Sequence, residues 1–257
     1  MSNPVAVNRT NVDGGEIAAL TGNVYNRVVV ANRASGTISV INSDNNQVEN
    51  TVDMPDNGQP MYVVYNDENN TVLVGDYNGQ VVAFDALDFS VVGTATAGNG
   101  VFHMWLSPDN QQLWVNNELD FTMSVINPNT METLATFPIP DDLLANGYKP
   151  HDVIVMPNNA AAFVTMLGPL EEDYVIKYDA TTFEEVARAT VGTDPHVSLT
   201  SANDKLYVAS QGSDILQVLN RSDLSLVTTV DIPNAHGLGM NNAGTCLLYT
   251  SPSPRDS

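Results

Sequence analysis

Hydrophobic and polar residues alternate in short runs along almost the whole chain. Five six-residue runs share an apolar centre that contains valine: RVVVAN at 27–32, TVLVGD at 71–76, QLWVNN at 112–117, AAFVTM at 161–166 and KLYVAS at 205–210. Period-two alternation of β-branched and aromatic residues, bounded by Gly, Asn and Asp, predicts β-strands rather than helices.

Each of these runs belongs to a longer repeat. A second alternating run follows each one after a polar turn, at 36–42, 79–85, 122–127, 174–179 and 214–220. A third run follows at 48–53, 91–96, 133–137 and 226–230, and a shorter run precedes the valine-containing one, as at 61–65 and 151–155. Four short strands in each unit of about 40–48 residues are typical of the blade of a β-propeller.

We therefore expect an all-β protein, a β-propeller built from four-stranded blades. After a lead-in at 1–15, residues 16–245 contain five blades and the opening strand of a sixth. The segment 246–257 breaks the repeat, because it places Ser-Pro-Ser-Pro where a strand is due and proline cannot donate to a β-ladder. This segment resembles the translation of a sequencing adapter, so we exclude it, and its Cys246, from the fold and expect the native chain to continue.

Several short motifs resemble the YVTN propeller repeat. They are SPDN at 107–110, QLWVNN at 112–117, SVIN at 124–127 and PHDVIV at 150–155. The resemblance extends loosely over about residues 16–244, and it implies closure at seven blades, so that one or two blades are missing here. Surface-layer and secreted propellers carry repeats of this type, and nitrous oxide reductase and lactonase-type propellers are more distantly similar.

The four histidines of the chain recur at one place in the repeat, the start of the first strand of a blade. They are His103, His151, His196 and His236, and Met61 is the matching residue of the preceding blade. In a propeller this place lies at one mouth of the central channel, where imidazoles of several blades can converge. Neutral histidine is a common transition-metal ligand, so these residues are candidate ligands for copper, iron or zinc.

A structural role is the alternative for these histidines. The YVTN pattern itself often carries His at this place, where the ring can bond to neighbouring loops and seat the strand. No carboxylate partner that would fix the tautomers can be assigned, although Asp152 and Asp194 are near in sequence. Both interpretations stay open at the level of the sequence.

The charge balance is strongly acidic, with 30 Asp and Glu against 9 Lys and Arg and a net charge of −21. Such a surface repels phosphate backbones and anionic lipid, which argues against nucleic acid and membrane insertion. Lysine occurs only at 149, 177 and 205, which fits a salty, extracytoplasmic setting, and we expect a periplasmic or extracellular location. Residues 1–4 show no signal peptide, and no run approaches the roughly 20 apolar residues of a membrane helix.

Three functions compete at this point. The first is an extracytoplasmic propeller that binds a small molecule or a protein, or acts as a scaffold, without catalysis. The second is an oxidoreductase that uses the ring of histidines for a metal or docks a redox cofactor. The third is a lactonase-like hydrolase, which rests on the resemblance alone. The sequence contains no Ser-His-Asp ordering, Gly-rich phosphate loop or zinc-type Cys cluster, and no catalytic residue can be named.

Overall fold

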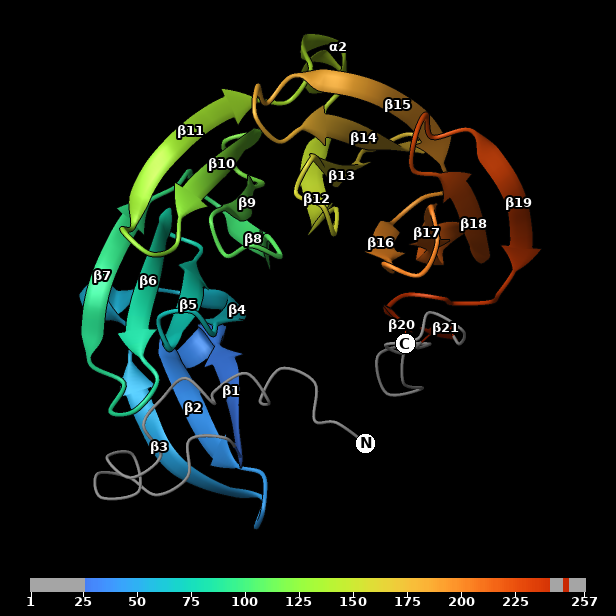
Figure 1. Cartoon of the computed structure of the whole chain (residues 1–257). Coiled ribbons are helices and arrows are strands. Elements are labelled where there is room, and N and C mark those ends of the chain that lie inside the picture. Colours follow the sequence, from blue (N-terminus) through green and yellow to red (C-terminus); the bar gives the residue numbers. More distant parts are fainter. Residues whose placement is uncertain (1–25, 241–246, 250–257) are drawn as a thin grey trace. The chain divides into compact units, whose positions relative to one another are not determined.

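Antiparallel β-strands are the dominant secondary structure of the computed structural model, which describes residues 26–240 and 247–249 (Figure 1). Within each sheet the strands hydrogen-bond in chain order, so each inner strand pairs with the strand before it and the strand after it. This confirms the predicted all-β fold with four-stranded blades. No described helix is long and apolar enough to cross a membrane.

The chain divides into two units. The first unit holds most of three sheets. Their strands are β1 (Arg27–Asn32), β2 (Thr37–Asn42) and β3 (Gln47–Asp53); β4 (Pro60–Asn66), β5 (Thr71–Asp76), β6 (Gln80–Asp85) and β7 (Val91–Thr96); and β8 (Val101–Leu106), β9 (Leu113–Asn117), β10 (Thr122–Asn127) and β11 (Glu132–Pro138). Two short 3-10 turns, η3 (Arg33–Ser35) and η4 (Pro55–Asn57), connect strands of this unit.

The second unit holds the remaining sheets. Their strands are β12 (Lys149–Val155), β13 (Ala161–Leu167), β14 (Asp173–Asp179) and β15 (Glu185–Val191); β16 (Pro195–Leu199), β17 (Lys205–Ser210), β18 (Ile215–Asn220) and β19 (Leu226–Asp231); and β20 (Leu238–Met240) and β21 (Leu247–Tyr249). A short helix α2 (Asp141–Ala145) precedes β12, and a 3-10 turn η5 (Gln211–Ser213) joins β17 to β18. Strand β21 lies within the segment 246–257; the other residues of that segment are outside the described ones, and its origin stays a prediction.

The apolar faces of neighbouring sheets pack against each other within each unit. In the second unit Ile154, Phe163 and Val175 of one sheet share a core with Leu206 and Val208 of the next. The first strands of successive sheets also lie side by side, since β4 contacts β8 in the first unit and β12 contacts β16 in the second. Buried apolar residues between sheets, and first strands next to each other, are the packing expected of propeller blades.

Four of the five predicted valine-containing runs, at 71–76, 112–117, 161–166 and 205–210, are the second strands of their sheets, and they include the most buried elements, whereas the run at 27–32 is β1, the first described strand of its sheet, and is partly buried. Every residue of β5 and of β9 is buried, whereas β19 is exposed along its whole length. A strand with neighbours on both sides and sheets on both faces loses its alternation of buried and exposed positions. This explains why these runs are the most apolar part of each repeat.

An unusual turn precedes the last strand of four sheets. Phe89, Met131, Phe183 and Leu224 adopt left-handed backbone conformations, with φ between 57° and 61°. Large side chains rarely adopt this conformation, which costs roughly 1–2 kcal/mol for residues other than glycine. Phe89 and Leu224 are nearly fully buried in the cores between sheets, so burial of the side chain offsets the backbone cost.

Candidate metal centre

The candidate site lies at the start of two neighbouring first strands of the second unit, β12 and β16. Strand β12 begins with Lys149, Pro150 and His151, and it contains a β-bulge between Pro150 and Val153. Strand β16 begins with Pro195 and His196 and pairs with β17 without interruption. His151 and His196 are both about nine-tenths buried or more, although the strands that carry them begin at loops.

The strand register shows that the histidines do not all occupy one position of the repeat. Val153 pairs with Val164, Met104 with Val115, and Val197 with Val208. In the first strands, the residues directly before Val153, Met104 and Val197 are Asp152, His103 and His196, respectively.

His103 therefore corresponds to Asp152 rather than to His151, and Met61, two residues before Val63, corresponds to His151. The sequence analysis assigned them all to one position because it aligned the histidines themselves and did not take the bulge in some of the first strands into account. Because β16 lacks the bulge, His196 takes the place that Asp152 has in β12.

Three donor atoms converge at this site. His151 Nε2 lies 3.4 Å from His196 Nε2 and 3.3 Å from Asp194 Oδ1. Asp194 Oδ1 lies 3.9 Å from His196 Nε2. Each residue thus offers one ligand atom to a common centre, from two neighbouring blades and the loop between them.

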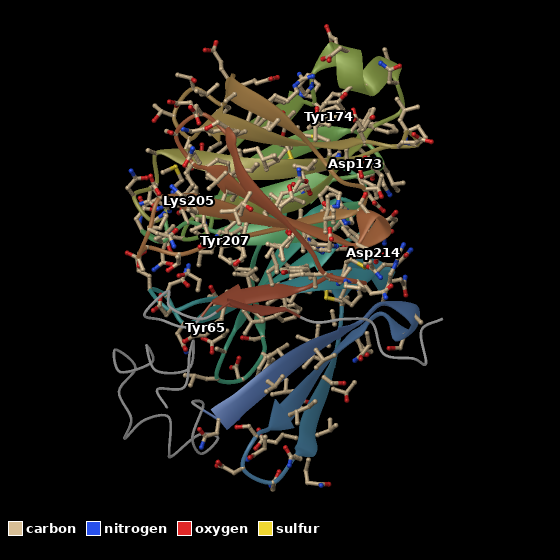
Figure 2. The ribbon with its side chains drawn as sticks, turned by 90° about the vertical axis from the view of Figure 1, so that its right-hand side faces the viewer. Tyr65, Asp173, Tyr174, Lys205, Tyr207 and Asp214 are labelled. Atoms are coloured by element: carbon tan, nitrogen blue, oxygen red, sulfur yellow. The ribbon has the colours of Figure 1, made fainter. Side chains whose placement is uncertain are left out.

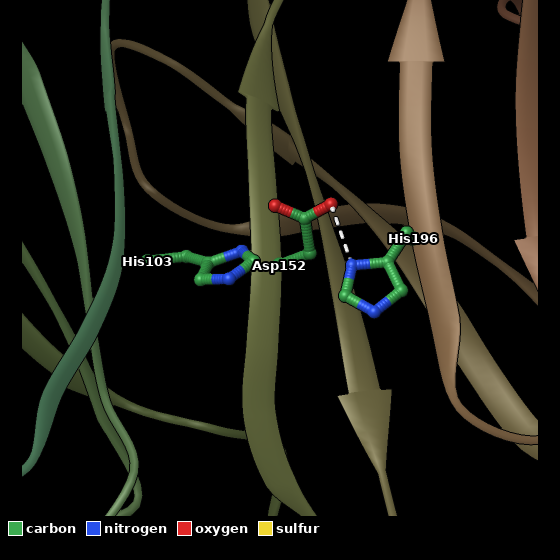
Figure 3. A group of neighbouring side chains, drawn as sticks. All are labelled: His103, Asp152 and His196. Atoms are coloured by element: carbon green, nitrogen blue, oxygen red, sulfur yellow. Dashed lines mark ion pairs between the residues drawn. The ribbon is translucent and has the colours of Figure 1, made fainter. Parts of the chain in front are cut away.

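A second carboxylate orients the ring of His196. Asp152 Oδ2 lies 3.6 Å from His196 Nδ1 (Figure 3), whereas the contacts with His151 and Asp194 are made by Nε2, the other ring nitrogen. The same oxygen accepts a hydrogen bond from the backbone N–H of Val197 at 3.0 Å, and Asp152 Oδ1 accepts one from Val153 at 2.8 Å. A carboxylate on the far nitrogen of a histidine is the usual outer-shell partner at metal sites, because it fixes the tautomer and the ring orientation.

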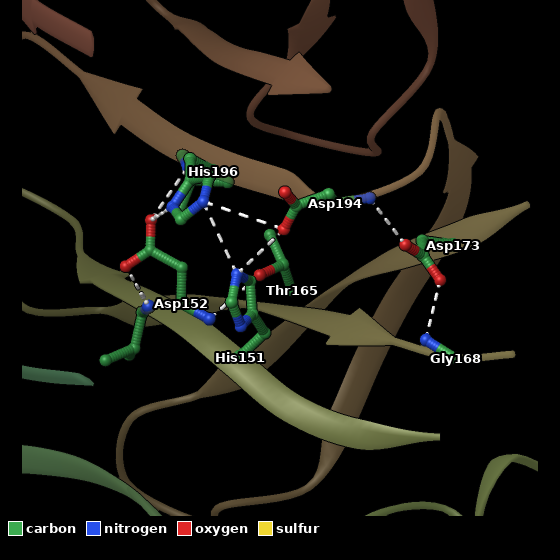
Figure 4. Close-up of polar contacts among 9 residues, drawn as sticks. His151, Asp152, Thr165, Gly168, Asp173, Asp194 and His196 are labelled. Atoms are coloured by element: carbon green, nitrogen blue, oxygen red, sulfur yellow. Dashed lines mark hydrogen bonds and ion pairs between the residues drawn. The ribbon is translucent and has the colours of Figure 1, made fainter. Parts of the chain in front are cut away.

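The backbone of Asp194 is held in a left-handed conformation, with φ 55°. Its N–H donates to Asp173 Oδ2 at 2.9 Å, and Asp173 Oδ1 accepts the N–H of Gly168 at 2.8 Å (Figure 4). The next repeat uses the same clamp, since Asp214 Oδ1 accepts the N–H of Asn234, whose φ is 54°. Asp173 and Asp214 are labelled in Figure 2 at the starts of β14 and β18, where this clamp recurs.

The carboxyl groups of Asp194 and Asp173 lie in different environments. A hydrogen bond from His151, with the charges of His151, His196 and His236, lowers the pKa of Asp194 below its usual range. Burial raises the pKa of Asp173, although the backbone N–H groups of Asp194 and Gly168 counteract part of that effect. The Asp194 carboxyl is therefore the one suited to be an ionised ligand, whereas Asp173 serves to hold the loop.

The third histidine of the second unit lies beside this cluster. The ring centroid of His236 is 4.0 Å from that of His196, with an angle of 57° between the rings. His236 is exposed, unlike the other two histidines. The structure thus brings His151, His196 and His236 together, and their role as metal ligands stays a prediction.

The other two candidates belong to the first unit. His103 stacks on Phe102, with ring centroids 4.8 Å apart, and its centroid is 4.9 Å from that of Tyr62. Met61 Sδ accepts a long contact of 3.9 Å from Nη1 of Arg33. His103 thus packs against two aromatic rings, and the roles of His103 and Met61 as ligands stay predictions.

The distances favour one coordination geometry. Zinc bonds of about 2.0–2.1 Å with tetrahedral angles put ligand atoms about 3.4 Å apart, whereas octahedral angles put neighbouring ligands about 3.0 Å apart. Two of the three observed distances match the tetrahedral value, and the third, 3.9 Å, exceeds it by about 0.5 Å.

Asp152 and Asp194 are near the histidines in the sequence, but the sequence alone assigned them no role. A usable signal was present: PHDV at 150–153 has one residue more between His and Val than PHV at 195–197. That difference predicts a bulge in one strand and not in the other, and so brings a carboxylate of one blade level with a histidine of the next. The inference also needs the blades side by side, which the tertiary structure supplies.

The fold is shared with solved structures. The sequence matches no family model, and no curated protein matches it significantly. Hydrazine synthase of Kuenenia stuttgartiensis is similar with a TM-score of 0.72 and 13% identity, over 87% of this chain and 70% of its own. A functionally unknown protein from Desulfotomaculum acetoxidans is similar with a TM-score of 0.71 and 16% identity, over 89% of this chain and 73% of its own. At these identities the likeness shows the fold alone, which is that of β-propeller proteins.

Proposed function

We propose that this chain is a YVTN-type propeller that binds one divalent transition-metal ion through His151, His196 and Asp194. The observation that carries the proposal is the convergence of two imidazole nitrogens and one carboxylate oxygen, with separations of 3.3, 3.4 and 3.9 Å. The orientation of His196 by Asp152 supports it, because a histidine that merely seats a strand has no need of this outer partner.

Zinc is the ion that we propose first among zinc, iron and copper. Two histidines and one carboxylate suit zinc and also non-haem iron(II). Zinc is redox-inert, so with zinc as the first choice we propose a non-redox role ahead of an oxidoreductase.

Metal content tests this proposal. The 257-residue chain, purified without a His tag, is expected to contain about one equivalent of zinc by elemental analysis, and to rebind it after dialysis against a chelator. His151→Gln and His196→Gln are each expected to lose most of that metal. Glu184→Gln, which removes an exposed carboxylate of the β14–β15 turn, is the matched control and should keep it. Equal metal content in all four proteins would refute the proposal.

A ligand- or protein-binding module outside the cytoplasm is the second candidate function. The net charge of −21 with only three lysines supports it, because such a surface stays soluble in salt and attracts basic partners. A chain that binds no metal and shows unchanged stability in both histidine variants would favour this candidate. The three histidines would then form a hydrogen-bonded cluster that seats the strands.

A further inference from the structure

A cavity of about 840 Å³ lies in the first unit, between the turn after β1 and the connection from β3 to β4. It is lined by residues 33–36, 53, 54 and 57–59. Two hydrogen bonds fix these loops, because the N–H of Met54 donates to the carbonyl oxygen of Gly36 at 2.8 Å and the N–H of Gln59 donates to Asp76 Oδ1 at 2.7 Å. Cavities of about 300–1,000 Å³ that are formed before binding are typical of small-molecule sites.

Arg33 is the basic residue of this lining, and its guanidinium is held in a fixed orientation. Its Cζ lies 3.7 Å from the centroid of the Tyr77 ring, and the Tyr77 hydroxyl donates to Glu118 Oε1 at 2.6 Å. Arg33 Nε also contacts Gln59 Oε1 at 3.4 Å. None of the ion pairs among the described residues involves Arg33. A stacked guanidinium of this kind can present two parallel N–H donors to a carboxylate.

Asp53 is the acidic residue of the same lining. It is the last residue of β3 and is exposed, and in the described part of the chain it too takes part in no ion pair. Arg33 and Asp53 thus offer opposite charges to one cavity without neutralising each other through direct contact. A ligand that carries both charges is complementary to this pair.

The backbone at the edge of the cavity is strained. Asp56 and Asn57 adopt left-handed conformations with φ 55° and 56°, and they are the only two consecutive residues to do so in the described ranges 26–240 and 247–249. Asn57 itself lines the cavity. Strain of this kind is found preferentially at ligand-binding and catalytic sites, where the surrounding structure maintains it.

We infer that this cavity binds a zwitterionic small molecule, a free α-amino acid, with its carboxylate on Arg33 and its ammonium group on Asp53. The two loops that carry these charges approach closely, since a Cβ atom added at Gly36 would lie 3.0 Å from the carbonyl oxygen of Gly58. The charges therefore suit a compact ligand. The cavity shares no residue with the proposed metal centre, so the inference does not depend on that centre.

The overall charge of the chain also favours a zwitterion. A net charge of −21 repels a simple anion before it reaches Arg33. A simple cation would meet Arg33 next to Asp53 and would leave the guanidinium without a partner. A ligand with no net charge avoids both penalties and still satisfies both side chains.

Analogues that lack one charge test the class of ligand. Thermal unfolding in the presence of each of the twenty L-amino acids selects the one that raises Tm most, and calorimetric titration then measures its affinity. The N-acetyl derivative of that amino acid, which lacks the ammonium group, and its amide, which lacks the carboxylate, should each bind at least about tenfold more weakly. Binding of either derivative as tight as that of the amino acid, or no binding of any amino acid, would overturn the inference.

Variants test the place of binding. Arg33→Gln and Asp53→Asn should each weaken the binding of the selected amino acid more than about tenfold. Both side chains are exposed, so these variants should melt at the temperature of the parent. Asp56→Asn is the matched control, because it removes a neighbouring carboxylate outside the lining, and it should bind as the parent does. Parental affinity in Arg33→Gln or Asp53→Asn, or an equal loss in Asp56→Asn, would assign the binding elsewhere and overturn the inference.

Discussion

Single residues decide the chemistry of this site, and Asp194 is the clearest case. Its left-handed backbone is held by the carboxylate of Asp173, and its side chain is turned to the two histidines. Asn234 occupies the matching place of the next repeat with the same backbone conformation. The fold therefore requires only a residue that tolerates this conformation, and the carboxylate of Asp194 is available for binding.

Replacement of Asp194 by Asn separates these two roles. Asn tolerates the left-handed region as Asp does, so we expect Asp194→Asn to change the free energy of unfolding without metal by less than about 1 kcal/mol. Zinc affinity should fall more than about tenfold, because an ionised ligand is lost. Denaturant titration in chelator and competition with a zinc-binding dye measure the two effects. Strong destabilisation with unchanged affinity would show that the carboxylate is structural.

At the scale of the elements, the repeated turn before the last strand shows how burial overrides backbone preference. Leu224 adopts φ 60° and is 3% exposed. It packs in the core that the β12–β15 and β16–β19 sheets share. Phe89 in the first unit combines the same left-handed backbone conformation with a buried side chain. The turn is therefore a feature of the repeat rather than of one blade.

At this turn we expect a Gly variant to be more stable than an Ala variant, which is the reverse of the usual order. Leu224→Ala should destabilise the protein by about 2–5 kcal/mol, because it removes a buried side chain and keeps the unfavourable backbone conformation. Leu224→Gly loses the same contacts but relieves that conformation, so we expect it to be more stable than the Ala variant by about 1 kcal/mol. Midpoints of urea unfolding would measure this order. A less stable Gly variant would contradict the explanation of the turn.

At the scale of the whole molecule, the proposed metal site would join two blades of the second unit. His151 belongs to β12, His196 to β16, and Asp194 to the loop that connects their sheets. An ion held by all three stabilises the packed arrangement of these sheets and does not bind the unfolded chain in the same way. Metal binding should therefore be visible in thermal unfolding.

The size of this effect follows from mass action. Zinc at a free concentration of 100 Kd should add about 2.7 kcal/mol to the free energy of unfolding. For a chain of this length that corresponds to a rise in Tm of roughly 5–10 °C. Scanning calorimetry with zinc, with chelator and with the His196→Gln variant would show the rise in the first sample alone. A Tm that zinc does not move would argue against a site made by both blades.

The sequence by itself determined the strands, the four-stranded repeat and the blade architecture. Alternation of apolar and polar residues is a local property that each repeat carries independently. The pattern can therefore be recognised even though the sequences of the repeats resemble one another only loosely. It also identified His151, His196 and His236 as residues that come together, because equivalent places of neighbouring blades lie side by side.

The tertiary structure alone decided which atoms meet. A bulge in β12 that β16 lacks shifts the register by one residue, which places Asp152 against the ring of His196. The clamp from Asp173 turns Asp194 toward the histidines. Both effects depend on contacts between residues that are distant in sequence. Local alternation carries no information about them, and so the histidines were predicted while their carboxylate partners were not.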